Sequence, residues 1–307
     1  MSVEQSFSTL LERVRTRQPL TRVVGLRGVG AAHALLRLAE CRPVVTVARS
    51  AVAAEDLVRD LRFVAGAERA PRILVLPADE RTPYHATSPD PLIVMERVAT
   101  LYKLACATPF DVLVMSPRAF ARRGLPLAAL QDMAILLSEG DEIERSALIA
   151  KLTLGGYSQV NSVEDPGTFA VRGGIIDVFW PGLPLPVRID LFGDEVESLK
   201  LFDPSTQRTR EQLDELSIGP AREIHLTDDA VERGRRRLRE LADEVEFPTK
   251  KLRELLTDLE ARIPFFGIES MLPAFHERLE LPVELLTQAL GRDGFTLALE
   301  EPDGLPA

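Results

Sequence analysis

The 307-residue chain has few cysteines and no long hydrophobic run. Cys41 and Cys106 lie in apolar helical patterns without metal-ligand spacing, which predicts buried thiols in a reducing compartment. His33 and His85 also have no acidic or thiol neighbour at ligand spacing, so no metal site is expected. No stretch approaches the ~18 apolar residues of a membrane span, and the charged first thirty residues exclude a secretory leader. These absences predict a soluble, cytoplasmic protein.

An excess of positive charge is absent as well, since 47 acidic and 37 basic side chains give a formal net charge of −10. This argues against a broad electrostatic contact with nucleic acid, which needs clustered basic surface. The one dense basic run, 233–239, lies in a helical pattern that favours a solvated helix face over a DNA patch. On that helix the residues expected to face inward are Val231, Leu238, Leu241 and Val245.

The chain is too long for one ordinary core, since ~100–150 residues per domain predicts two or three units. In residues 1–128, short apolar runs alternate with helical patterns, which indicates a parallel sheet covered by helices. The strands expected there are Arg22–Val24, Val44–Ala48, Ile73–Leu76 and Val112–Met115.

A glycine-rich turn follows the first expected strand and contains Gly25, Gly28 and Gly30. Its spacing matches the phosphate-binding loop G-x-x-x-x-G-K-[ST], but Ala31 and Ala32 occupy the positions of the lysine and the Ser/Thr. Nothing then reaches the β- and γ-phosphates or holds magnesium, although backbone N–H groups can still face an anion. We predict a nucleotide-binding scaffold that has lost its site, and no ATPase activity.

Residues 129–218 have a different composition. A short helical pattern at Ala147–Leu154 precedes four strand patterns, with hairpin turns at Gly173-Gly174 and Gly193-Asp194. The expected strands are Thr168–Arg172, Ile175–Trp180, Val187–Phe192 and Ser198–Phe202. Successive hairpins predict an antiparallel sheet, so this part is α+β.

One of these strands, 187–192, combines an apolar face with an unusual opposite face. Its odd-numbered residues are apolar and are expected to face the core, because side chains alternate along a strand. The other face carries Arg188, Asp190 and Phe192. The same alternation adds Arg172, and arginine near an exposed ring is typical of a protein-binding hot spot. The alternative is an ordinary sheet surface, on which Asp177 or Asp190 forms a cross-strand pair with an arginine.

Residues 219–307 return to helical patterns and end in an apolar strand, Phe295–Leu299. Thr227 and Pro248 mark the starts of two helices. This segment has no sheet of its own, so we expect it to complete the domain that begins in residues 1–128. The polar residues after Leu299 are typical of a linker, which indicates a piece of a longer protein.

The predicted fold class is therefore α/β. It consists of a degenerate P-loop or RecA-like domain formed by two chain segments, 1–128 and 219–307. Between them lies an inserted α+β domain, 129–218, that contains the antiparallel sheet.

Several long runs of the sequence resemble the signature shared by the excision-repair protein UvrB and the transcription-repair coupling factors. These runs are Arg172–Phe179 with Pro181-Gly182, Arg188–Ser198, Phe202-Asp203-Pro204 and Gln207-Arg208. The loop Leu76–Pro89 and the run Gly267–Glu269 resemble the coupling factors too, so the resemblance covers nearly the whole chain. UvrB-type proteins carry the phosphate-binding lysine that is Ala31 here. The chain is therefore similar to the N-terminal, UvrB-like module of the coupling factors.

This resemblance implies a recruitment module, not an enzyme, in which the inserted domain binds the damage sensor UvrA by mimicking UvrB. The family's contact residues fall on Arg172, Arg188 and Phe192, and no cofactor is implied. RNA polymerase and DNA are contacted in the full-length proteins by domains without a counterpart here. We expect Arg188→Ala or Phe192→Ala to weaken UvrA binding by at least ~1–2 kcal/mol, while the melting temperature hardly changes.

Two alternatives remain open at this stage. One is a UvrB-like, ATP-dependent DNA-repair helicase subunit, from which the missing lysine distinguishes this chain. The other is a structural or autoinhibitory module, whose UvrA-binding face is masked by a C-terminal domain of the full-length protein.

Overall fold

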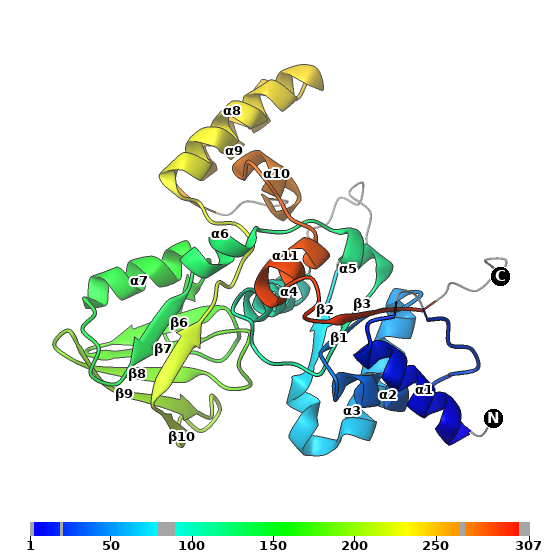
Figure 1. Cartoon of the computed structure of the whole chain (residues 1–307). Helices are drawn as coiled ribbons and strands as arrows, with labels where there is room; N and C mark the ends of the chain where they lie inside the picture. Colours follow the sequence, from blue (N-terminus) through cyan, green and yellow to red (C-terminus); the bar gives the residue numbers. More distant parts are fainter. Residues whose placement is uncertain (1–2, 19–20, 79–89, 264–267, 301–307) are drawn as a thin grey trace. The chain divides into compact units, whose positions relative to one another are not determined.

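The structure is a computed structural model that describes residues 3–18, 21–78, 90–263 and 268–300 (Figure 1). Internal contacts divide the chain into two compact units. The first unit combines Met1–Glu80, Leu104–Arg122 and Leu281–Ala307, and the second combines Arg81–Lys103 and Arg123–Glu280. Most of the loop Leu76–Pro89, including His85, lies outside the described residues, as does Gly267.

The first unit contains a parallel sheet with strand order β12-β1-β3-β2. Its strands are β1 (Val44–Val47), β2 (Ile73–Leu76), β3 (Val112–Met115) and β12 (Thr296–Leu299). β1 and β3 are buried along their whole length, as expected of apolar runs that have both faces covered. The predicted parallel sheet is confirmed, and the C-terminal strand belongs to it, because Thr296 pairs with Val44.

Three helices of this unit share one apolar cluster with the sheet. They are α1 (Val3–Arg15), α2 (Val29–Ala39) and α3 (Ala51–Arg69), and they lie together beside β1 in Figure 1. The unit also contains η1 (Ala70–Arg72), α5 (Pro117–Ala121) and α11 (Pro282–Leu290). Helix α4 (Pro91–Ala105) contributes residues to both units.

The strand expected at Arg22–Val24 is not formed, so that prediction is wrong. A strand needs both a paired backbone and covered side chains, but Val23 and Val24 are exposed and pair with no strand among the described residues. The glycine-rich turn therefore has the predicted helix after it, α2, but no strand before it.

The second unit contains a six-stranded sheet with strand order β10-β9-β8-β7-β6-β5. Its strands are β5 (Ser158–Gln159), β6 (Thr168–Arg172), β7 (Ile175–Phe179), β8 (Val187–Phe192), β9 (Glu195–Phe202) and β10 (Thr209–Leu213). The four predicted strands are confirmed as antiparallel neighbours. Both hairpin turns are confirmed, with glycines at positive φ: 61° at Gly173 and 67° at Gly193. The edge strands β5 and β10 were not predicted from the sequence.

One face of this sheet forms the core of the second unit. Helix α7 (Arg145–Leu154) contributes Leu148 and Leu152 to a cluster with the odd-numbered residues of β8, as predicted for that strand. The unit also contains α6 (Leu127–Asp132) and a two-stranded antiparallel sheet of β4 (Ile135–Ser138) and β11 (Glu215–Ile218). The arginine-bearing face of the six-stranded sheet points away from this core.

The helices after β11 are α8 (Asp228–Glu244), α9 (Thr249–Glu260), η2 (Ile268–Met271) and α10 (Leu272–Phe275). The two predicted helix starts are confirmed, and Thr227 caps α8 by accepting a hydrogen bond from the Ala230 N–H. The buried positions of α8 are Ala230, Gly234, Leu238 and Ala242. Leu241 and Val245 are exposed, so their predicted burial is wrong. The buried stripe includes Gly234, which permits close approach: a Cβ there would lie 2.6 Å from the Phe275 ring.

The boundary predicted after residue 218 does not coincide with the division by contacts. Of the segment 219–307, only Leu281–Ala307 belongs to the first unit. Ala221 joins the core cluster of the second unit, and Glu223 accepts a hydrogen bond of 3.1 Å from Arg97 of the same unit. The chain is thus anchored in the second unit before α8 begins.

Cys106 is exposed and Cys41 is half-buried, so the prediction of buried thiols is wrong for Cys106, which lies one residue beyond the end of α4. Among the described residues, no helix is long and apolar enough to cross a membrane. The same residues contain no group of three or more His, Cys, Asp or Glu side chains that could hold a metal ion.

The lowered pKa of His276, in the second unit, predicts a pH-dependent stability. Burial, reinforced by the charges of His225 and Arg233, lowers the pKa of His276 to about 4. The unfolded chain, with an ordinary histidine pKa of 6.5, therefore binds a proton first. Stability from this group is complete above pH 6.5 and is lost as the pH falls toward about 4.

We therefore expect the midpoint of urea unfolding to fall across this pH window. His276→Gln should flatten the dependence, and the exposed His33→Gln serves as the matched control. An unchanged slope in His276→Gln would contradict the assignment.

Candidate protein-binding surface

The strand registers bring the predicted residues to one face of the six-stranded sheet. Ala170, Asp177, Arg188 and Lys200 lie side by side across four strands. The next row contains Arg172, Ile175, Asp190 and Ser198. Paired residues project to the same side of a sheet, so Arg172, Arg188 and Asp190 share a face, and the alternation along β8 adds Phe192.

Asp177 lies at the centre of this face and binds both arginines. Its carboxylate is buried, with 1% of the side chain exposed. Oδ1 accepts a hydrogen bond from Arg188 Nε at 2.7 Å, and Oδ2 accepts from Arg188 Nη2 at 2.9 Å and from Arg172 Nη2 at 2.5 Å. The hydrogen bond to Asp177 raises the pKa of Arg188 above its ordinary value. The cross-strand pair that the sequence left as an alternative is therefore formed, and it involves two arginines.

The two arginines differ in what they offer to a partner. Arg188 also donates to Gln207 Oε1 at 3.1 Å, and its guanidinium carbon lies 4.6 Å from the centre of the Phe202 ring, so only 19% of its side chain is exposed. Half of the Arg172 side chain is exposed. Its hydrogen bond to Asp177 uses Nη2 alone, and Nε and Nη1 form no hydrogen bond with the described residues.

Asp190 forms a second, smaller pair on the same face. It accepts hydrogen bonds from Lys200 Nζ and Ser198 Oγ, both at 2.7 Å. Partial burial by itself raises the pKa of Asp190, but these hydrogen bonds and the charges of Lys200 and Arg188 outweigh it and leave the pKa below its ordinary value. This pair is charge-balanced.

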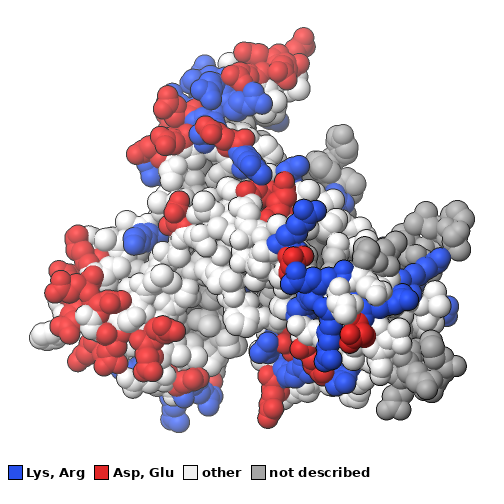
Figure 2. Space-filling model, in the orientation of Figure 1, with Lys and Arg blue, Asp and Glu red and all other residues white. Residues whose placement is uncertain are grey.

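Phe192 ends strand β8 with 78% of its surface exposed. It borders a shallow hollow whose other lining residues include Glu139, Glu195 and Glu197. Figure 2 shows acidic side chains gathered over this unit, at the left of the view. The face thus combines an exposed ring in acidic surroundings with an arginine that has free donors.

Sequence reasoning missed the contributions of Phe202 and Gln207. Phe202 follows Lys200 by two positions, so the same alternation could have placed it on this face. Gln207 comes from the turn between β9 and β10, where it has a positive φ of 59°. That turn is held by Asp203, which accepts hydrogen bonds from the backbone N–H groups of Ser205 and Thr206. No periodic pattern marks such a position.

The glycine-rich turn ahead of α2 has positive φ at Gly25 and Gly28, 83° and 50°. The N–H groups of Gly30, Ala31 and Ala32 donate to Arg27 O, Gly28 O and Gly28 O at 3.1, 2.9 and 3.2 Å. Ala32 is buried in the core of the first unit. The amides expected to face an anion are therefore engaged by backbone oxygens.

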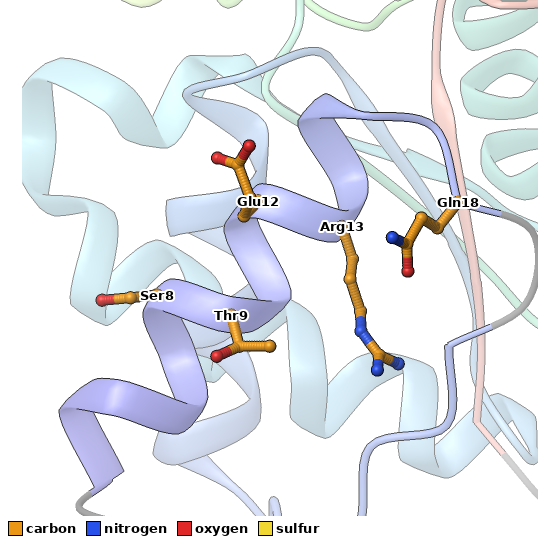
Figure 3. A pocket seen from close by; sticks show the side chains of 5 residues that line it. All are labelled: Ser8, Thr9, Glu12, Arg13 and Gln18. Carbon is orange, nitrogen blue, oxygen red and sulfur yellow. The ribbon is translucent and has the colours of Figure 1, made fainter.

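A second hollow lies along α1 and is lined by Ser8, Thr9, Glu12, Arg13 and Gln18. Figure 3 shows Ser8 and Glu12 pointing away from Arg13 instead of converging with it. This arrangement has no common point at which a ligand could be held, so the sheet face remains the candidate site.

Residues 135–224 match the family model of the UvrB interaction domain. This span runs from β4 to the segment after β11, so it includes the whole six-stranded sheet and its arginine-bearing face. Within the second unit, residues 135–224 thus resemble a UvrB interaction domain.

The chain as a whole is similar to transcription-repair-coupling factors. It is 41% identical to that of Myxococcus xanthus over 305 residues, which cover 94% of this chain and 25% of the relative. Identity is 35% over 153 residues with that of Escherichia coli (50% of this chain, 13% of the relative) and 29% over 278 residues with that of Mycobacterium bovis (88% and 21%). The chain spans a quarter or less of the length of these relatives. The predicted resemblance to the N-terminal module of coupling factors is confirmed.

Proposed function

We propose that the chain is a non-catalytic recruitment module of a transcription-repair coupling factor. It binds the excision-repair damage sensor UvrA by mimicking UvrB, and it thereby links stalled transcription to DNA repair. The observation that carries this proposal is the match of residues 135–224 to the UvrB interaction domain, whose sheet presents Arg172 and Phe192 on an open face. In a longer protein of this kind, contacts with RNA polymerase and DNA come from other domains.

Docking uses the two ends of this face in different ways. The Phe192 ring supplies apolar area that becomes buried against the partner, while the free donors of Arg172 fix the orientation. The carboxylates of Glu139, Glu195 and Glu197 favour a partner whose apolar pocket is flanked by basic groups.

The first unit acts as a scaffold in this proposal. We assign it to a degenerate P-loop or RecA-like domain, supported by the four-stranded parallel sheet and the glycine-rich turn ahead of α2. Ala31 and Ala32 lack the groups that would contact phosphates or magnesium, and the amides of the turn are engaged by backbone oxygens. The rival UvrB-like ATP-dependent enzyme predicts ATP turnover that DNA stimulates, whereas we expect none with or without DNA.

Phe192→Ala is the sharpest test of the proposed function. Because the ring is exposed in the free protein, we expect UvrA affinity to fall by at least ~1–2 kcal/mol while the melting temperature stays unchanged. Isothermal titration calorimetry and thermal unfolding measure the two quantities. Phe63→Ala removes an equally exposed ring from the first unit and should bind like wild type. Wild-type affinity in Phe192→Ala would refute the proposed site.

Arg188→Ala does not separate binding from stability, so the earlier expectation of an unchanged melting temperature is revised for this residue. Its removal leaves the buried Asp177 with one arginine and uncovers the Phe202 ring. Both UvrA affinity and the melting temperature should fall. Arg172→Ala, at a half-exposed position, is the cleaner arginine variant.

A further inference from the structure

The position of Asp177 on β7 places its buried carboxylate within reach of two arginines. Arg188 is directly opposite it on β8, and the residue directly opposite on β6 is the small Ala170. Arg172 lies two positions further along β6 and reaches the same carboxylate from the diagonal position. Three strands therefore meet at one acidic group, which accepts three hydrogen bonds from arginines.

An arginine can favour binding through its positive charge or through the fixed orientation of its guanidinium, and Asp177 affects these two in opposite directions. A free arginine side chain loses rotamer entropy when a partner immobilises it, whereas one already held presents its planar fork without that loss. The negative charge of Asp177 also offsets one of the two positive charges. If charge alone attracted the partner, Asp177 would weaken binding. If orientation matters, Asp177 strengthens it.

We propose that Asp177 is the positioning residue of the docking surface, which holds Arg172 so that its free Nε and Nη1 donors form a fixed fork for a carboxylate of the partner. Arg188 is the less exposed of the two arginines, because Gln207 and the Phe202 ring contact it. This inference rests on the proposed function, because it assigns the chemistry of the same surface.

Asp177→Asn tests the inference by calorimetric titration with UvrA. The variant makes the face more positive but releases the arginines, and we expect the affinity to fall about tenfold. Asp111→Asn is the matched control, because it removes a buried carboxylate of the first unit that likewise pairs with two arginines, Arg69 and Arg72, and it should bind within about twofold of wild type. Binding of Asp177→Asn as tight as wild type, or tighter, overturns the proposal.

A double-mutant cycle distinguishes positioning from a general structural role. If Asp177 acts through Arg172, then Asp177→Asn should cost little further affinity in an Arg172→Ala background. Losses that simply add would show that Asp177 acts elsewhere and would overturn the inference. Arg172→Lys tests the planar fork itself at a half-exposed position, where folding is not at risk, so the proposal can be tested even if Asp177→Asn fails to fold. Charge without a planar fork should bind about as weakly as Arg172→Ala, and wild-type affinity would overturn the proposal.

A measurement without UvrA separates this inference from the proposed function. Side-chain NMR relaxation of Arg172 Nε should show an ordered guanidinium in wild type and a mobile one in Asp177→Asn. Equal mobility in both proteins overturns the positioning role, whatever UvrA does. Failure of the wild-type chain to bind UvrA contradicts the proposed function and leaves this readout intact.

Discussion

Glu223→Gln is expected to lower the free energy of unfolding by about 3–5 kcal/mol. Glu223 and Arg97 form an ion pair of 3.1 Å in the second unit, with 2% and 1% of their side chains exposed. Removing the carboxylate takes from the buried Arg97 a negative charge with which it pairs. Such a charge is costly away from water, whereas an intact buried pair contributes little by itself.

Urea unfolding followed by circular dichroism measures this loss. The control is Glu240→Gln, which breaks an exposed pair with Arg237 on α8 and should change stability by no more than about 0.5 kcal/mol. Equal effects of the two substitutions would mean that the Arg97–Glu223 pair does not lie in a water-excluded site.

The second large effect is expected for Phe202→Ala, with a loss of about 3–5 kcal/mol. Phe202 is fully buried and packs in a small cluster with Val163, Ala170 and Phe179. Its ring also supports the Arg188 guanidinium, so the substitution both creates a cavity and loosens the arginine pair. Stability and UvrA affinity should therefore fall together.

Phe192→Ala provides the matched comparison for this prediction. It makes the same chemical change on the same sheet face, but at an exposed ring, and should lower UvrA affinity without changing stability. A Phe202→Ala variant as stable as Phe192→Ala would contradict the cluster described for this face.

The arginine-bearing face of the six-stranded sheet was predictable where it depends on alternation alone. Side chains of a strand point to opposite sides, so Arg188, Asp190 and Phe192 could be placed on one face without knowing the neighbouring strands. The pairing of Asp177 with both arginines was not predictable, because it depends on the registers of β6 and β8 against β7. From the sequence, Asp190 could have supplied the acid equally well, and it pairs with Lys200 instead.

Elsewhere, the predictions that failed relied on local hydrophobicity without a packing partner. The valines of Arg22–Val24 favoured a strand, but they pair with no strand among the described residues. Leu241 and Val245 fitted a helical stripe, but both are exposed. The buried stripe of α8 instead includes Gly234, which permits close approach of the Phe275 ring. Which side chains become buried depends on the tertiary structure, and the sequence of a single segment does not determine it.

The position of β12 has a consequence for the order of folding. β12 pairs with β1, although about 250 residues separate them in the sequence. The strands of the six-stranded sheet, by contrast, all lie between Ser158 and Leu213 and pair mainly with their sequence neighbours. Nearby pairs close quickly, and distant parallel pairs close slowly. During synthesis the six-stranded sheet can therefore form first, while β1 keeps an unpaired edge, a site for aggregation, until β12 emerges from the ribosome.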